Sequence, residues 1–122
     1  VTISDKDKEE ALPLVRRFYD LGFNIEGTAG TARFLIENGI RTHVLDKISD
    51  GSEDIPEAIR QGHIAYVINT QNVRSTGQMR DGYMIRKCAT ENNVTLFSSL
   101  DTVRVLLDVL DETTLRISTI DA

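Results

Sequence analysis

The chain has 122 residues, and its 40% hydrophobic and 27% charged residues are typical of one globular domain rather than of a disordered chain. Its formal net charge of −5 argues against a general nucleic-acid-binding protein, and no apolar run approaches the length that spans a bilayer. The single Cys88 excludes an internal disulfide and is compatible with a reducing compartment, so we expect a cytoplasmic protein without membrane partners.

The predicted elements begin with a short buried strand at residues 1–3. Because the chain starts inside this strand without Met, we expect a domain excised from a longer protein. Apolar residues at helical spacing from Ala11 to Leu21 predict the first helix, which Pro13 should bend or delay and Gly22 should end. The next predicted elements are a strand at residues 23–27, a helix at 30–38, a strand at 42–45 and a polar loop at 46–54.

The second half of the chain continues the alternation. In order, it holds a short helix at residues 55–61, a strand at 65–69, a loop at 70–80, a helix capped by Asp81, a strand at 96–97 and a helix from Leu100 to Leu110. The tail at residues 111–122 alternates only weakly, which predicts either an added edge strand or a loose end. Five strands that alternate with helices predict an α/β fold, a Rossmann-like three-layer sandwich with a five-stranded parallel sheet.

The most informative motif is the turn Gly27-Thr28-Ala29-Gly30-Thr31-Ala32, which joins a predicted strand to a predicted helix. Its small residues would let an anion approach the unpaired N–H groups at the helix start, and Thr28 and Thr31 add two hydroxyl donors. The turn lacks the Gly-Lys-Ser/Thr ending of a P-loop and the glycine spacing of a dinucleotide-binding fingerprint. It predicts either phosphate binding without a metal or a plain turn with Thr31 as helix cap.

The residues that follow each predicted strand mark the edge where open α/β sheets bind ligands. They are Ser4, Asp5, Lys6 and Lys8 after the first strand, Thr28, Ala29, Gly30 and Thr31 after the second, Lys47 after the third, Asn69, Thr70, Gln71 and Asn72 after the fourth, and Ser98 and Ser99 after the fifth. Cations, hydroxyls and amides outnumber carboxylates here, although the chain holds 19 Asp and Glu residues. The set predicts an anion-binding edge whose amides could read a base or a sugar.

Other reactive side chains are expected to be structural. His43 and His63 have no Cys, His or acid at the spacing of metal ligands, so no metal site is predicted. Cys88 lies on the apolar face of a helix, where packing is expected rather than nucleophilic catalysis. Arg86 and Lys87 could form a solvated helix face or reach an effector, and the solvated face is favoured.

Five stretches of the chain, in the same order, resemble the methylglyoxal synthase-like domain. They are Ser4-Asp5-Lys6-Asp7-Lys8, the turn at residues 27–32, Asp46-Lys47-Ile48, Val67-Ile68-Asn69-Thr70 and the run from Arg80 to Lys87. The resemblance covers residues 1–110, leaving 111–122 as a C-terminal tail. It is closest to the version at the C-terminus of the large subunit of carbamoyl phosphate synthetase, an ATP-dependent ligase in which this domain is the allosteric module.

The resemblance implies an effector site and its partners. By position, the expected phosphate-binding residues are Lys8, Thr28, Gly30, Thr31, Lys47, Asn69 and Thr70, with Asp46 in place of the Asn that usually precedes Lys47. The implied effector is of the UMP, IMP or phosphoribosyl pyrophosphate type, and it would regulate carbamoyl phosphate synthesis for the pyrimidine and arginine pathways. The implied partners are the remaining domains of the large subunit and the glutaminase small subunit. A homo-oligomer is also compatible, and no cofactor or nucleic acid is expected.

A lyase is the alternative that the resemblance leaves open. The same fold in methylglyoxal synthase eliminates phosphate from dihydroxyacetone phosphate, which needs a carboxylate base beside the phosphate. That enzyme has Gly-Gly-Asp-Gln in its third loop and Trp-Asp-Pro after its fourth strand. The corresponding stretches here are Asp50-Gly51-Ser52-Glu53-Asp54 and Gln71-Asn72-Val73. Because Asn72 cannot act as a base and only Glu53 or Asp54 could replace the other carboxylate, the resemblance favours a regulatory domain without catalytic residues.

Overall fold

The structure is a computed structural model, and it describes residues 1–46, 53–70 and 76–121. Side chains are described for the same residues except 76–81 and 114–121. The elements in chain order are η1 (Asp5–Asp7), α1 (Lys8–Asp20), β1 (Ile25–Thr28), α2 (Ala29–Glu37), β2 (Thr42–Leu45), α3 (Asp54–Arg60), β3 (Tyr66–Ile68), α4 (Thr76–Glu91), β4 (Thr95–Phe97) and α5 (Leu100–Asp121). No helix among the described residues is long and apolar enough to cross a membrane.

The α/β alternation predicted from the sequence is confirmed, but the five-stranded sheet is wrong. The described strands form two parallel two-stranded sheets, β1 with β2 and β3 with β4. Residues 1–4 lie between β1 and β3, and the predicted first strand is reduced to a single bridge between Thr2 and Asn69. In a parallel sheet, successive residues of a strand form hydrogen bonds with opposite neighbouring strands. Residue 1 therefore pairs only with β1 and residue 2 only with the end of β3, and one pair on each side is too few for a ladder of hydrogen bonds.

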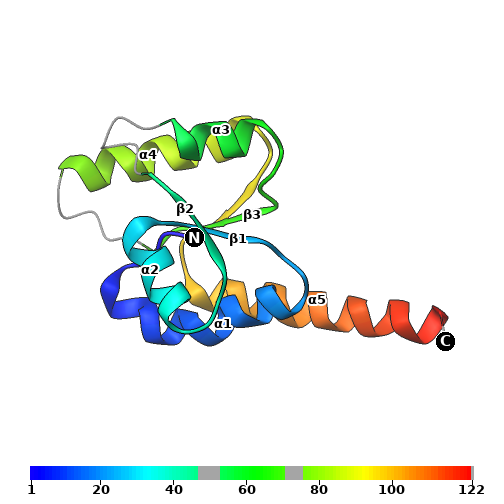
Figure 1. Ribbon diagram of the computed structural model, residues 1–122. Helices are drawn as coiled ribbons and strands as arrows, with labels where there is room; N and C mark the ends of the chain where they lie inside the picture. Colours follow the sequence, from blue (N-terminus) through cyan, green and yellow to red (C-terminus); the bar gives the residue numbers. More distant parts are fainter. Residues whose placement is uncertain (47–52, 71–75, 122) are drawn as a thin grey trace.

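Helices cover both faces of the paired strands (Figure 1). Helices α1, α2 and α5 enclose one apolar cluster, and α3 and α4 enclose the other. Neighbouring residues of β3 contribute to both clusters, because successive side chains of a strand point to opposite faces. Val67 packs against α3 and α4, whereas Ile68 packs in the cluster of α1 and α5. Each buried aliphatic side chain of this kind stabilises the fold by about 1.5–3 kcal/mol.

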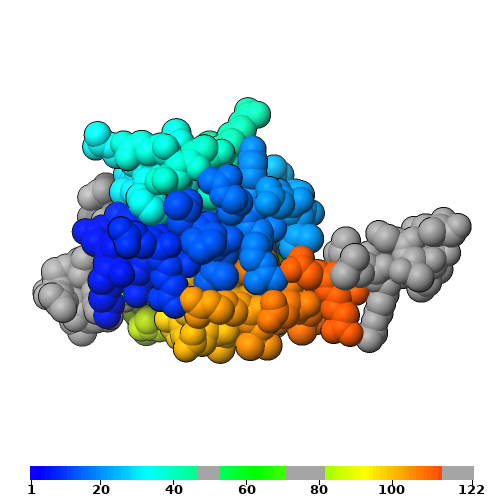
Figure 2. Space-filling model, turned by 90° about the horizontal axis from the view of Figure 1, so that it is seen from below, coloured from blue at the N-terminus to red at the C-terminus, as the bar shows by residue number. Residues whose placement is uncertain are grey.

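Helix α5 lies beside α1, as Figure 2 shows for the blue and orange segments. Val103 and Leu107 of α5 are fully buried in this contact, and the Arg17 side chain of α1 reaches Asp108 at 3.0 Å and Asp111 at 2.5 Å. The helix continues to Asp121, so the prediction of an edge strand or a loose end after residue 110 is wrong. The weak alternation there was misleading, because a helix that is already nucleated by packing extends without an apolar pattern of its own.

Two further boundaries differ from the prediction. Helix α4 begins at Thr76, whereas a loop was predicted up to residue 80 with Asp81 as the cap. Apolar periodicity reports a buried face, so it cannot detect the polar first turns of a helix. Helix α1 begins at Lys8, so Pro13 does not delay its start.

Candidate functional site

The start of α2 is open toward solvent at the carboxyl end of β1. Thr28 is the N-cap residue with extended backbone, and within the described part of the chain its side chain makes no capping hydrogen bond. Its hydroxyl instead donates to the Thr2 hydroxyl at 3.2 Å. Ala29 and Gly30 are exposed, and the first turn of α2 contains no acidic residue. The N–H groups of this first turn therefore point to a surface that favours an anion.

Lys8 lies beside this helix start. The Lys8 ammonium is 3.9 Å from the position that a Cβ atom would take at Gly30. The sequence placed these two residues at the same sheet edge, and the structure brings them together. The ammonium also pairs with the Asp5 carboxylate at 2.5 Å. Asp5 is almost fully exposed, so this ion pair contributes little to stability and leaves the ammonium available to a second anion.

Thr31 is the third residue of α2, so the reading of Thr31 as the helix cap is wrong. Its side chain is 2% exposed, and its hydroxyl oxygen accepts the Ile3 N–H at 3.0 Å. The same hydroxyl is 3.4 Å from the Ile3 carbonyl, which is a long distance for a donated hydrogen bond. Thr31 therefore holds residues 1–4 against α2, while its proton is only weakly engaged.

Asn69 and Thr70 reach residues 1–4 from the opposite side. The Thr70 hydroxyl accepts the Ser4 N–H at 3.1 Å, and the Thr70 N–H donates to the Thr2 carbonyl at 3.0 Å. The Asn69 side chain is buried, and its amide nitrogen is 4.0 Å from the position of a Cβ atom at Gly82. Residues 1–4 are therefore contacted from both sides, by Thr31 of α2 and by Thr70 at the end of β3.

Arg86 is a residue that the sequence analysis placed on a solvated helix face. One of its guanidinium nitrogens is 3.3 Å from the position of a Cβ atom at Gly82, one turn earlier in α4. The guanidinium and the Asn69 amide therefore both lie within 4.0 Å of the same point at Gly82. The sequence does contain a signal for the contact between Gly82 and Arg86. The two residues are four apart on one helix, and residues at this spacing lie on the same face.

The family model described as the MGS-like domain matches residues 10–98. The chain belongs to the MGS-like domain family. The matched range begins just after Lys8 and contains the turn at residues 27–32 together with Asn69, Thr70 and Arg86. Lys47, Gln71 and Asn72 lie outside the residues that the structure describes.

Glu53 and Asp54 are the two carboxylates that the sequence offered to a lyase, and the structure describes both. One oxygen of Asp54 accepts the Asp46 N–H at 3.1 Å, and an oxygen of Glu53 is 3.9 Å from the Arg60 guanidinium. Among the described residues, no three His, Cys, Asp or Glu side chains gather as a metal site would require.

Proposed function

We propose that this MGS-like domain is an allosteric effector-binding module of the carbamoyl phosphate synthetase type, which binds a phosphorylated small molecule and regulates carbamoyl phosphate synthesis. The observation that supports it most is the open start of α2 with the Lys8 ammonium beside Gly30. The phosphate would accept hydrogen bonds from the first N–H groups of α2 and from the Lys8 ammonium. The Thr31 proton could join them without losing the bond from the Ile3 N–H.

The proposed contacts are of the stronger, charge-assisted kind. Each hydrogen bond to a charged acceptor contributes about 1.5–3 kcal/mol, and the helix dipole adds about 0.3–1 kcal/mol for an anion at its start. Part of this gain offsets the translational and rotational freedom lost on association, so further contacts to the rest of the effector are needed for a micromolar complex.

The rest of the effector would extend from α2 toward α4. Asn69 offers an amide at the end of β3, and Arg86 offers a cation that, like this amide, lies close to Gly82. An amide can read the edge of a base, and a guanidinium can contact a ribose or a second phosphate. Lys47 enters this proposal only through the resemblance of its motif.

Regulation requires that the effector bind one state of the attached synthetase more tightly than the other. A coupling of about 1–3 kcal/mol is typical of such systems. The connection would run through residues 1–4, which Thr31 contacts from α2 and Thr70 contacts from the end of β3. The partners would be the remaining domains of the large subunit and, through them, the glutaminase subunit.

The test is titration calorimetry with UMP, IMP, phosphoribosyl pyrophosphate and inorganic phosphate. We expect binding by at least one phosphorylated metabolite, a loss of about tenfold in Lys8→Ala and a weaker salt dependence of the remaining affinity. Arg86→Ala should lower the affinity for the metabolite more than that for inorganic phosphate. Lys87→Ala is the matched control, because it removes the same charge from an exposed neighbour of Arg86.

Two results would contradict the proposal. If Lys8→Ala and Lys87→Ala bind every ligand as the parent does, the phosphate does not lie at the start of α2. If the chain converts dihydroxyacetone phosphate well above the uncatalysed rate, and Glu53→Gln or Asp54→Asn abolishes this turnover, the domain is a lyase of the methylglyoxal synthase type.

A further inference from the structure

The pair Asn38-Gly39 lies at the carboxyl end of α2, and Asn38 is the only asparagine in the sequence that glycine follows. Both residues are exposed, so water and dissolved bases reach them. In such a pair, the backbone nitrogen of the second residue can attack the side-chain carbonyl carbon of the asparagine, and glycine places no side chain in the way. The sequence therefore contains one pair that is suited to spontaneous deamidation.

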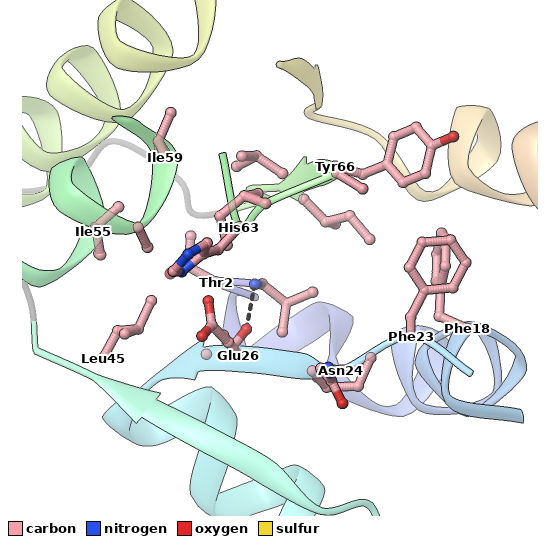
Figure 3. Close-up of a pocket in the computed structure, with 18 of the residues that line it drawn as sticks. Thr2, Phe18, Phe23, Asn24, Glu26, Leu45, Ile55, Ile59, His63 and Tyr66 are labelled. Atoms are coloured by element: carbon pink, nitrogen blue, oxygen red, sulfur yellow. Dashed lines mark hydrogen bonds between the residues drawn. The ribbon is translucent and has the colours of Figure 1, made fainter. Parts of the chain in front are cut away.

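Asn24 is the asparagine that compares best with Asn38. It is also exposed, and it lies in the wall of a cavity of about 340 Å³ lined by residues of β1 and β3 (Figure 3). Ile25 follows it, and its branched side chain is buried in the core. A β-branched residue crowds its own backbone nitrogen, so attack on the Asn24 side chain is hindered. Asn24 thus serves as an internal reference.

The end of α2 is closed by two crossing hydrogen bonds. The Gly39 N–H donates to the Ile36 carbonyl at 3.1 Å, and the Ile40 N–H donates to the Leu35 carbonyl at 2.9 Å. This is a Schellman motif, which depends on the positive φ of 85° at Gly39. Leu35 and Ile40 are 2% and 0% exposed and belong to the same buried cluster, so the cap is anchored in the core.

The closed cap keeps the reacting atoms of Asn38 and Gly39 apart. A succinimide ring forms only when the Gly39 nitrogen lies on the same side of the Asn38 Cα–C bond as Cβ, whereas the ψ of 18° holds the two nearly opposite. The Asn38 amide is also engaged, because it donates to the Phe34 carbonyl at 2.8 Å. The reaction therefore requires the cap to open first.

Arg16 of α1 opposes this opening. Its guanidinium donates to the Asn38 carbonyl at 2.6 Å and so ties the end of α2 to another helix. A cation at the carboxyl end of a helix also interacts favourably with the helix dipole. Loss of this side chain should make opening of the cap easier.

We propose that Asn38 is a site of spontaneous modification, at which opening of the α2 cap sets the rate and the isoaspartate product prevents the cap from closing again. The Gly39 nitrogen loses its proton to a base in the solvent and bonds to Asn38 Cγ. The bond from Cγ to Nδ2 breaks, and the nitrogen leaves as ammonia with a proton from water. Water then opens the succinimide at either carbonyl, which gives aspartate or isoaspartate. This inference does not depend on the proposed effector.

The two products have different effects on α2. In isoaspartate the backbone runs through the side-chain carbon, so one further carbon separates residues 38 and 39. The N–H groups of Gly39 and Ile40 are then displaced from the carbonyls that they bind in the cap. The aspartate product keeps the backbone, but a carboxylate replaces the amide that donates to the Phe34 carbonyl. Its charge is also unfavourable at this end of the helix dipole.

The first experiment incubates the chain at mildly alkaline pH and measures deamidation at each asparagine by peptide mass spectrometry. Asn38 should react at least tenfold faster than Asn24, because only Asn38 precedes glycine. Unfolding in urea should speed the reaction of Asn38 at least tenfold, because the cap is then absent. Arg16→Ala should speed it about two- to fivefold in the folded chain. Arg33→Ala is the matched control, since it removes the same charge from α2 without a contact to the cap.

Two results of this experiment would overturn the proposal. If Asn38 reacts equally fast in the folded and the unfolded chain, the cap does not control the reaction. If Asn24 or another asparagine is modified before Asn38, the pair with glycine is not the site. Equal rates in Arg16→Ala and Arg33→Ala would mean that opening of the cap does not limit the reaction, which also contradicts the proposal.

The second experiment separates the isoaspartate product by chromatography and compares its amide hydrogen exchange with that of Asn38→Asp. The Ile40 N–H should exchange at least tenfold faster in the isoaspartate product, because its bond to the Leu35 carbonyl is lost. Asn38→Asp carries the same charge on an unchanged backbone, so it should keep most of the protection. If the isoaspartate product protects the Ile40 N–H as the parent does, the cap closes again and the proposal is wrong.

Discussion

The hydrogen bond between Thr31 and Ile3 gives a prediction whose magnitude can be worked from the structure. The Thr31 hydroxyl accepts the Ile3 N–H at 3.0 Å, and both residues are 2% exposed. Thr31→Val keeps the branched shape and the volume, so it leaves no cavity, but it removes the acceptor. The Ile3 N–H then stays buried without a partner, which costs about 1–3 kcal/mol. We expect a loss of about 2 kcal/mol in the free energy of unfolding.

Thermal and urea denaturation followed by circular dichroism measure this loss. About 2 kcal/mol corresponds to a decrease of roughly 6–10 °C in Tm for a domain of this size. Thr31→Ser keeps the hydroxyl and should recover most of the stability. Thr113→Val makes the same chemical change at an exposed position, where the hydroxyl donates to the Val109 carbonyl of its own helix, and should change stability by less than about 0.5 kcal/mol.

The reasoning would be refuted if Thr31→Val were as stable as Thr31→Ser. The Ile3 N–H would then find another acceptor, and Thr31 would not hold residues 1–4 against α2. Equal losses in Thr31→Val and Thr113→Val would instead show that the effect belongs to threonine replacement in general and not to this buried bond.

Three other predictions concern charge and backbone at the same end of the molecule. Asp5→Asn removes the carboxylate that pairs with Lys8 and repels an anion, so calorimetry should show phosphate effectors binding about two- to fivefold more tightly. Gly30→Ala should raise the free energy of unfolding by about 0.5–1 kcal/mol and yet weaken effector binding, because the methyl group would occupy the approach of the anion. The unfolded chain binds more protons than the folded one between pH 6 and 8, because burial lowers the pKa of the Val1 ammonium from 8.0 to about 6. Unfolding free energy should therefore rise by about 2 kcal/mol across that range, and acetylation of Val1 should remove the rise.

Local signals in the sequence were sufficient to locate most elements. The strand predicted at residues 42–45 is β2 itself, and the predicted strands around β1 and β3 overlap them. Gly22 and Gly39 follow α1 and α2 with φ values of 98° and 85°, which only glycine adopts easily. The spacing of apolar residues and the preference of glycine for turns both act over a few residues, so they can be interpreted without knowing the fold.

Pairing between strands could not be read in the same way. Whether residues 1–3 form a strand depends on how many residues meet β1 and β3, which lie far away in the sequence. Their apolar character predicted burial correctly, since Thr2 and Ile3 are buried, but it did not predict the number of pairs. A strand is defined by its neighbours, whereas a helix is defined by its own residues.

The candidate site shows the same division between local and distant information. The rule that ligands bind at the carboxyl ends of strands placed Lys8 near Gly30, and the structure brings them together. The burial of Thr31 was not predictable, because its partner Ile3 lies 28 residues earlier. The solvated helix face predicted for Arg86 and Lys87 agrees with the exposure of both residues, but the approach of Arg86 and Asn69 to the same glycine, Gly82, was not predictable, because Asn69 comes from another part of the chain.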